Sequence, residues 1–245
     1  MANLLKFGDY TPEAAEQEAK QLGGNDFLKL EVGKTRLRVM PPPPGENSPM
    51  RVVPQHAVEV PDQQYPIRFQ CPGKGCPACA EAQRLSRTGN PKDRERAYQM
   101  GVRQRVFCLA ISRKEEERGP LVWEFGKKIH EQLKKLRLND DAGGNFSHPY
   151  EGFDVIVERE GTGKNDTTYT LFPARQSTPL HADEEQMVEW CDNRPDLDRY
   201  TRLMSIDEVK KLLGAEDDEG AEEAPRKQLA GKKAKTRTAE DDIDA

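Results

Sequence analysis

Long hydrophobic runs and evenly paired cysteines are missing from this sequence of 245 residues. No uncharged apolar run approaches the roughly 18 residues that a membrane-spanning helix needs, so we expect no membrane partner. Residues 1–8 lack the apolar core of a signal peptide. The 5 cysteines are an odd number and three of them lie close together, which argues against a secreted disulfide framework. These absences predict an intracellular protein with reduced thiols.

Motifs that mark an enzyme are missing as well. The segment 161–164 (GTGK) resembles a phosphate-binding loop, but Glu158 stands where that loop needs its first glycine and Asn165 follows the lysine. A zinc nuclease or nucleotide-modifying enzyme would need a carboxylate cluster or an open metal shell, and the sequence displays neither. The sequence therefore predicts a protein that is not an enzyme.

Charge is unevenly spread along the chain, whose formal net charge is -5. Residues 27–138 carry 22 Lys and Arg against 12 Asp and Glu, a net charge of +10. Residues 1–26, 139–214 and 215–245 carry net charges of -3, -8 and -4. A basic middle between acidic segments is typical of a polyanion-binding domain with an acidic tail, although an unevenly charged solvated surface would give the same pattern.

The apolar patterns predict a mainly β protein with helical insertions, of the α+β class. Strands are predicted over residues 27–32 and 35–39, which form a hairpin or bent strand, and over 52–53 with 57–60, 105–111, 121–125, 153–159 and 167–172. Helices are predicted over residues 76–85, 91–100, 127–138, 182–191 and 205–213. The last helix has Ser205 as N-cap and Glu208 three positions later. Five or six strands with interspersed helices indicate a small, partly open β-barrel.

Composition divides the chain into three parts. Residues 1–26 form an N-terminal arm with an amphipathic segment at residues 3–24, residues 27–214 hold the predicted strands, and residues 215–245 form an acidic tail. Leu229 and Ile243 are the large apolar residues of that tail, too few to build a core, so we expect it to be disordered.

Four metal-binding side chains occur at the spacing His56-x14-Cys71-x4-Cys76-x2-Cys79. Zinc prefers tetrahedral thiolate and imidazole ligands, and a Cys-x2-Cys pair lets two thiolates from one turn reach one ion. Three thiolates and one imidazole close the shell and leave no position for a catalytic water, so we interpret the site as one structural Zn²⁺. The alternative is a group of thiols without a metal. A deaminase does not fit, because in the segment 56–59 (HAVE) the acid comes one position too late.

Aromatic and basic residues are interleaved through the middle of the chain. Single-stranded nucleic acid offers base faces for stacking and phosphates for ion pairing, and this composition matches both. Three aromatic residues at alternating strand positions are assigned to the core: Phe107, Phe125 and Phe153. Three others lie near loops, carry a hydroxyl and are assigned to a binding surface: Tyr98, Tyr150 and Tyr169. The basic candidates for that surface are Arg103, Arg105, Arg113, Lys114, Lys127 and Lys128.

Together these features resemble a known family, the single-stranded-DNA-binding proteins of T-even-like bacteriophages, over roughly residues 25–180. The resemblance is carried by residues 125–129 (FGKKI), by residues 150–152 (YEG), and by the His-Cys-Cys-Cys set. It implies an oligonucleotide-binding (OB) fold barrel with a zinc subdomain inserted at about residues 52–100, and a cleft between them for single-stranded DNA. The zinc shell that it implies is His56, Cys71, Cys76 and Cys79. The resemblance also implies which residues face the single-stranded DNA, namely Tyr98, Arg103, Arg105, Lys127, Lys128 and Tyr169.

The resemblance also implies a function. Such proteins coat and protect single-stranded DNA without sequence specificity during replication, recombination and repair. Their acidic tail recruits replication and recombination proteins and competes with DNA for the basic groove. A basic patch in their N-terminal arm supports self-association on DNA, whereas residues 1–26 of this chain are net acidic. If phage-encoded, such a protein would work in the host cytoplasm. The alternative hypothesis is a zinc-stabilised RNA-binding or translational-repressor module, because nothing in the sequence separates RNA from DNA.

Overall fold

The computed structural model describes residues 26–61, 63–139, 141, 144–163 and 166–214. The expected acidic tail, and all but the last residue of the expected N-terminal arm, lie outside the described residues. Across the described ranges, none of the helices combines the length and the apolar character that crossing a bilayer demands.

Seven strands form one antiparallel sheet in the order β3-β2-β4-β1-β6-β7, with β5 paired to β4 beside this path. The strands are β1 (Gly33–Val39), β2 (Arg51–Val58), β3 (Ile67–Gln70), β4 (Arg103–Ser112), β5 (Leu121–Gly126), β6 (Phe153–Glu160) and β7 (Thr168–Ser177). Strand β4 is central and pairs with β1, β2 and β5. The hairpin of β6 and β7 confirms the last two predicted strands.

Five α-helices accompany the sheet in the described residues: α2 (Pro77–Ser86), α3 (Pro91–Met100), α4 (Lys127–Leu138), α5 (Glu184–Asp192) and α6 (Ile206–Leu212). Two short 3-10 helices are η1 (Glu116–Arg118) and η3 (Leu197–Tyr200). Helix α3 begins at Pro91, whose fixed φ suits a first helical turn, and the Asn90 side chain accepts a hydrogen bond from the Lys92 amide at 3.0 Å. Helix α6 has the predicted capping box between Ser205 and Glu208. The five predicted helices are thus confirmed.

The predicted hairpin at the start of the core is wrong. Residues 27–32 contain no strand, and Phe27 makes only an isolated bridge to Val122. Strand β1 begins at Gly33, which has a positive φ of 102°, and pairs with β6 and β4 instead of with the preceding segment. Leu28 and Leu30 pack against the main core from outside the sheet, which accounts for their apolar spacing.

The sheet is open in the described part of the chain. Its path ends at β3 on one side and at β7 on the other, and no pairing within the described ranges joins these two edges. The combination of one antiparallel sheet with five helices confirms the predicted α+β class. The predicted closure of the sheet into a barrel is not confirmed. The sequence analysis did not predict strand β3, because its four residues, enclosed by Pro66 and Pro72, are too few to show an alternating pattern.

Three hydrophobic cores hold the sheet and the helices together. Along β4, Val106, Cys108 and Ala110 belong to the core under α4, and the residues between them belong to the core on the opposite face. The predicted core aromatics Phe107, Phe125 and Phe153 are buried, as expected. A third core lies among β2, β3, α2, α3 and α6.

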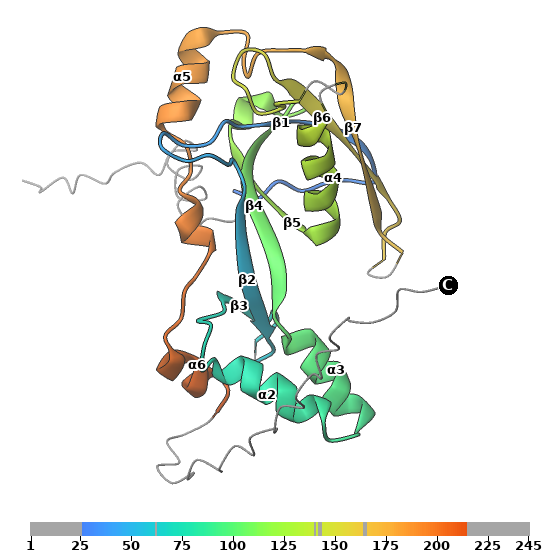
Figure 1. The fold of residues 1–245 in the computed structure, drawn as a ribbon, viewed down its shortest axis with the longest axis vertical. Coiled ribbons are helices and arrows are strands. Elements are labelled where there is room, and N and C mark those ends of the chain that lie inside the picture. The colour runs from blue at the N-terminus through green and yellow to red at the C-terminus, as the bar shows by residue number, and fades with distance from the viewer. Residues whose placement is uncertain (1–25, 62, 140, 142–143, 164–165, 215–245) are drawn as a thin grey trace, which may run out of the picture.

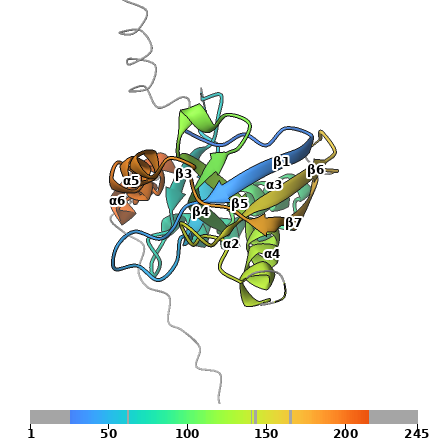
Figure 2. The same ribbon diagram turned by 90° about the horizontal axis from the view of Figure 1, so that it is seen from above.

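The cores divide the molecule into two regions joined by the long β2–β4 pair (Figure 1). One region holds β1, β5, β6, β7 and α4, and the other holds β3, α2, α3 and α6 (Figure 1). Viewed from above, α5 and α6 lie on one side of the sheet, away from α4 (Figure 2). The strands β2 and β4 run from one region into the other, so residues near their junction can form a site between the two.

Candidate metal centre and nucleic-acid interface

The structure brings together the four predicted metal ligands. His56 lies on β2, Cys71 directly follows β3, Cys76 is the N-cap of α2, and Cys79 lies in the first turn of α2. Between the strand and the helix the chain turns tightly through Gly73 and Gly75, whose φ values of 87° and 80° suit glycine. The turn through these glycines lets Cys71 and Cys79, at the two ends of the segment, come close to each other.

Three of the distances among the four ligand atoms match those around a tetrahedral ion. All four atoms lie within 4.8 Å of one another. The Cys71 and Cys79 sulfurs are 3.7 Å apart, and His56 Nε2 is 3.5 Å from the sulfurs of both Cys76 and Cys79. A tetrahedron with Zn–S bonds of about 2.3 Å and a Zn–N bond of about 2.0 Å has edges of about 3.8 Å and 3.5 Å. The group is therefore a possible metal site of the predicted composition.

The surroundings of the cluster orient its ligands. His56 is buried, and its Nδ1 is 2.8 Å from the Met100 carbonyl, so that Nδ1 donates its proton there and Nε2 turns its lone pair toward the sulfurs. Burial, together with the hydrogen bonds and charges of the neighbouring Cys71 and Cys76, raises the pKa of the Cys79 thiol to about 12. A metal ion bound among the three sulfurs would take the place of the thiol protons.

The two remaining cysteines are separate from the cluster. Cys108 is fully buried in the core under α4, and burial raises its pKa. Cys191 is half-buried beside the core on the opposite face, and burial raises its pKa as well. All 5 cysteines are free. Both residues act as small apolar side chains, as the sequence predicted.

A basic groove lies beside the metal cluster, where β2, β3 and β4 meet the end of α3. Its lining residues are Gln55, His56, Ala57, Arg68, Gln99, Gly101, Arg103 and Arg105. The cavity is small, about 70 Å³. Its lining residues include three arginines and no carboxylate, and the Glu124 carboxylate next to the lining pairs with Arg68 and Arg105. An anion can therefore enter the groove through arginines that it shares with Glu124.

An aromatic side chain extends from the rim of this groove. Tyr98 on α3 is 71% exposed, and the Arg103 guanidinium carbon lies 4.6 Å from the centroid of its ring. Arg103 Nη2 also donates a hydrogen bond to the Tyr98 carbonyl at 3.1 Å. The predicted tyrosine and arginine are therefore neighbours, although they lie on different elements.

The groove leads to the start of α4. Arg105 pairs across the sheet with Gly126, the N-cap of α4, and a Cβ atom on Gly126 would lie 3.7 Å from Arg105 Nη1. Lys127 and Lys128, in the first turn of α4, are exposed. That turn contains no acidic residue, and the N-cap has no side chain to occupy its amides. The predicted residues Arg105, Lys127 and Lys128 thus lie in one neighbourhood.

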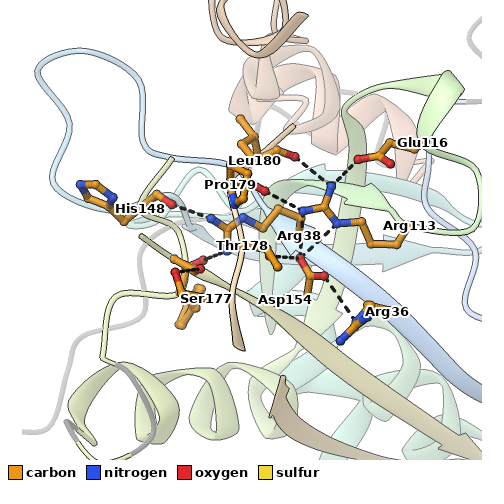
Figure 3. Close-up of polar contacts among 12 residues, drawn as sticks. Arg36, Arg38, Arg113, Glu116, His148, Asp154, Ser177, Thr178, Pro179 and Leu180 are labelled. Atoms are coloured by element: carbon orange, nitrogen blue, oxygen red, sulfur yellow. Dashed lines mark hydrogen bonds and ion pairs between the residues drawn. The ribbon is translucent and has the colours of Figure 1, made fainter. Parts of the chain in front are cut away.

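Arg113 and Lys114 lie at the opposite end of β4. The ten residues of β4 separate them from Arg103 by roughly 30 Å along the strand. Arg113 is used internally: its Nε donates to Asp154 at 3.1 Å and its Nη1 and Nη2 donate to the Leu180 and Pro179 carbonyls, both at 2.9 Å (Figure 3). It also pairs with Glu116 (Figure 3). These contacts give Arg113 a structural role in the sheet.

The other predicted surface residues lie outside the groove lining. Lys114 pairs with Glu31 at 3.0 Å. Tyr150 is 54% exposed, and its hydroxyl donates a hydrogen bond to Glu184 at 2.9 Å. Tyr169 on β7 is half-buried and packs against the core under α4.

Sequence reasoning missed two residues of this site, Arg68 and Glu124. Arg68 lies on the short strand β3, which has no periodic signal, and it reaches Glu124 on β5 at 3.0 Å. The two residues are 56 positions apart in the sequence, so no local pattern links them. Only the sheet order β3-β2-β4 with β5 at its side brings them together.

Arginines and an exposed tyrosine are the residue types that bind single-stranded nucleic acids. The model of a family described as gp32 DNA binding protein like matches residues 31–216 of the chain. The match covers well over half of the chain, which therefore belongs to this family of single-stranded-DNA-binding proteins, which are not enzymes. The predicted family and the absence of enzymatic activity are thereby confirmed. A search among curated proteins finds no match.

Proposed function

We propose that this protein binds single-stranded DNA without sequence specificity in the groove beside the metal cluster, and so coats and protects exposed strands. The observation that carries the proposal is the convergence of Arg68, Arg103 and Arg105 with the exposed Tyr98 in a chain of a DNA-binding family. Phosphates would pair with the arginines and a base would stack on the ring, and neither contact reads sequence.

In this proposal the single-stranded DNA continues from the groove to the first turn of α4. Lys127 and Lys128 are exposed there, close to Arg105, and would contact further phosphates. Tyr169 on β7 would contribute from the edge of this path. We leave Arg113, Lys114 and Tyr150 out of the proposed interface, because they lie neither in the groove lining nor in the first turn of α4.

We further propose that His56, Cys71, Cys76 and Cys79 hold one structural Zn²⁺. The three short ligand distances, and a set of three sulfurs and one imidazole nitrogen that fills four tetrahedral positions, support a structural zinc over a catalytic metal. The ion would fix β2, β3 and α2 relative to one another, and through Met100 it would fix the end of α3 that carries Tyr98. Zinc would therefore support DNA binding without contacting DNA.

The domain organisation remains part of the proposal. Residues 27–214 would be an OB-type core with the zinc subdomain at about residues 52–100. Residues 1–26 would be an arm for self-association on DNA, and residues 215–245 an acidic tail that recruits replication and recombination proteins. The protein would thus act inside a cell in phage-type DNA replication, recombination and repair.

A competition experiment tests the proposed function. A labelled single-stranded oligodeoxynucleotide bound to the full chain is challenged with unlabelled single-stranded DNA, single-stranded RNA and duplex DNA of the same length. We expect single-stranded DNA of any sequence to compete best and duplex to compete poorly. Stronger competition by RNA would favour the RNA-binding alternative, and equal competition by duplex would contradict the proposal.

A further inference from the structure

A largely buried carboxylate lies against the arginines of the groove. Glu124 on β5 has a side chain that is only 16% exposed, and its Oε1 accepts hydrogen bonds from Arg105 Nε at 2.7 Å and from Arg68 Nη1 at 3.0 Å. Its Oε2 is 3.2 Å from the same Arg68 nitrogen. One carboxylate is thus shared by two of the three groove arginines.

We infer that Glu124 sets how tightly the groove holds DNA, by competing with the phosphate backbone for Arg68 and Arg105; this inference rests on the proposed function. The side chain of Arg68 is 55% exposed and that of Arg105 is 32% exposed. Phosphates can therefore reach both guanidinium groups while these are ion-paired with Glu124. A carboxylate and a phosphate near the same arginines repel each other, and this repulsion is strong where water is partly excluded.

The position of Glu124 gives this competition a second consequence. Arg68 belongs to β3 in the metal-cluster region, whereas Glu124 and Arg105 belong to β5 and β4, so the carboxylate bridges the two sides of the groove. When a phosphate pairs with Arg68, it replaces Glu124 as the partner of that arginine. Glu124 remains paired with Arg105, so both arginines keep an anionic partner. Binding is then an exchange of partners, which keeps the affinity moderate and the complex reversible.

Replacing Glu124 by glutamine tests the inference, because the amide keeps the shape and one acceptor while it removes the charge. We expect E124Q to bind a single-stranded oligodeoxynucleotide about fivefold more tightly at low salt, with the gain shrinking as salt screens the removed repulsion. The plot of log K against log salt should become steeper by about 0.7 for each arginine that is freed. Glu124→Met, a second neutral variant, should act in the same direction if the glutamine variant is unstable.

The matched control is Glu81→Gln. Glu81 on α2 pairs with Arg84 through two contacts of 2.7 Å and lies outside the groove lining, so its neutralisation should leave affinity and salt slope unchanged. Equal or weaker binding by folded E124Q or Glu124→Met would overturn the inference, since a carboxylate that merely positions the arginines gives that result. The proposed function fails separately: it fails if the wild-type chain does not prefer single strands or if Arg105→Gln leaves binding unchanged.

Discussion

Arg103 lies over the ring of Tyr98, with its guanidinium carbon 4.6 Å from the ring centroid. The two residues belong to β4 and α3, and the hydrogen bond from Arg103 to the Tyr98 carbonyl fixes the pair. Because the tyrosine remains 71% exposed, its ring is a ready platform for a base, next to a cation for the adjoining phosphate.

Removal of this ring should weaken DNA binding. We expect Tyr98→Ala to lose about 1–3 kcal/mol of binding free energy, the contribution of one stacked base. Tyr98→Phe should bind like the wild type, because stacking needs the ring and not the hydroxyl. Fluorescence anisotropy with a labelled oligodeoxynucleotide at fixed salt measures both. Wild-type affinity in the alanine variant would remove Tyr98 from the interface.

Loss of one cluster ligand should release the metal. Cys76 is buried, and its sulfur lies 3.5 Å from His56 Nε2, so Cys76→Ser should lower the zinc content from one equivalent to a small fraction. Elemental analysis of protein purified without chelator measures this, and thermal unfolding should begin at a lower temperature. Cys191→Ser, which alters a thiol outside the cluster, should keep the full equivalent. Less than half an equivalent of zinc in the wild type would contradict the metal assignment.

Gly152 should tolerate no side chain. A Cβ atom there would lie 2.7 Å from Arg38 Nη2 and 2.6 Å from the His148 carbonyl oxygen, which are joined by a partly buried hydrogen bond. We expect Gly152→Ala to reduce the free energy of unfolding by about 1–3 kcal/mol. Urea denaturation measures the change, and Gly126→Ala, whose Cβ meets its nearest atom at 3.7 Å, should lose about 0.5 kcal/mol. Equal losses in the two variants would contradict the packing argument.

Truncation after Gly214 should strengthen DNA binding at low salt. Residues 215–245 carry 10 Asp and Glu against 6 Lys and Arg, and a tethered segment can reach a millimolar effective concentration at the basic groove. Competition between tail and DNA therefore predicts tighter binding by the truncated chain, with a difference that disappears as salt screens both contacts. Titrations at low and high salt measure this. Unchanged affinity at low salt would leave recruitment of partner proteins as the tail's only proposed role.

Local signals made parts of this structure predictable. Pro91 and Gly126 mark the starts of α3 and α4, and the spacing from His56 to Cys79 identified the metal cluster. Contacts between distant segments could not be predicted. The sequence suggests Arg113 as a DNA contact because of its positive charge. It could not show that the pairing of β1 with β6 and β4 places Arg113 beside the buried Asp154. Glu124 and Arg68 meet only because β3 and β5 flank the β2–β4 pair.

The location of DNA in the arginine groove is tested most directly by the salt dependence of binding. The variant Arg103→Gln with Arg105→Gln is compared with Lys210→Gln plus Lys211→Gln, which removes the same charge from α6, outside the groove lining. Each phosphate contact to single-stranded DNA contributes about 0.7 to the slope of log K against log salt. We predict that the slope falls by about 0.7 to 1.4 in the arginine variant, because Arg103 contributes about 0.7 and Arg105, which is shared with Glu124, contributes at most as much again. In the lysine variant the slope stays at the wild-type value. Equal slopes in the two variants would contradict the account.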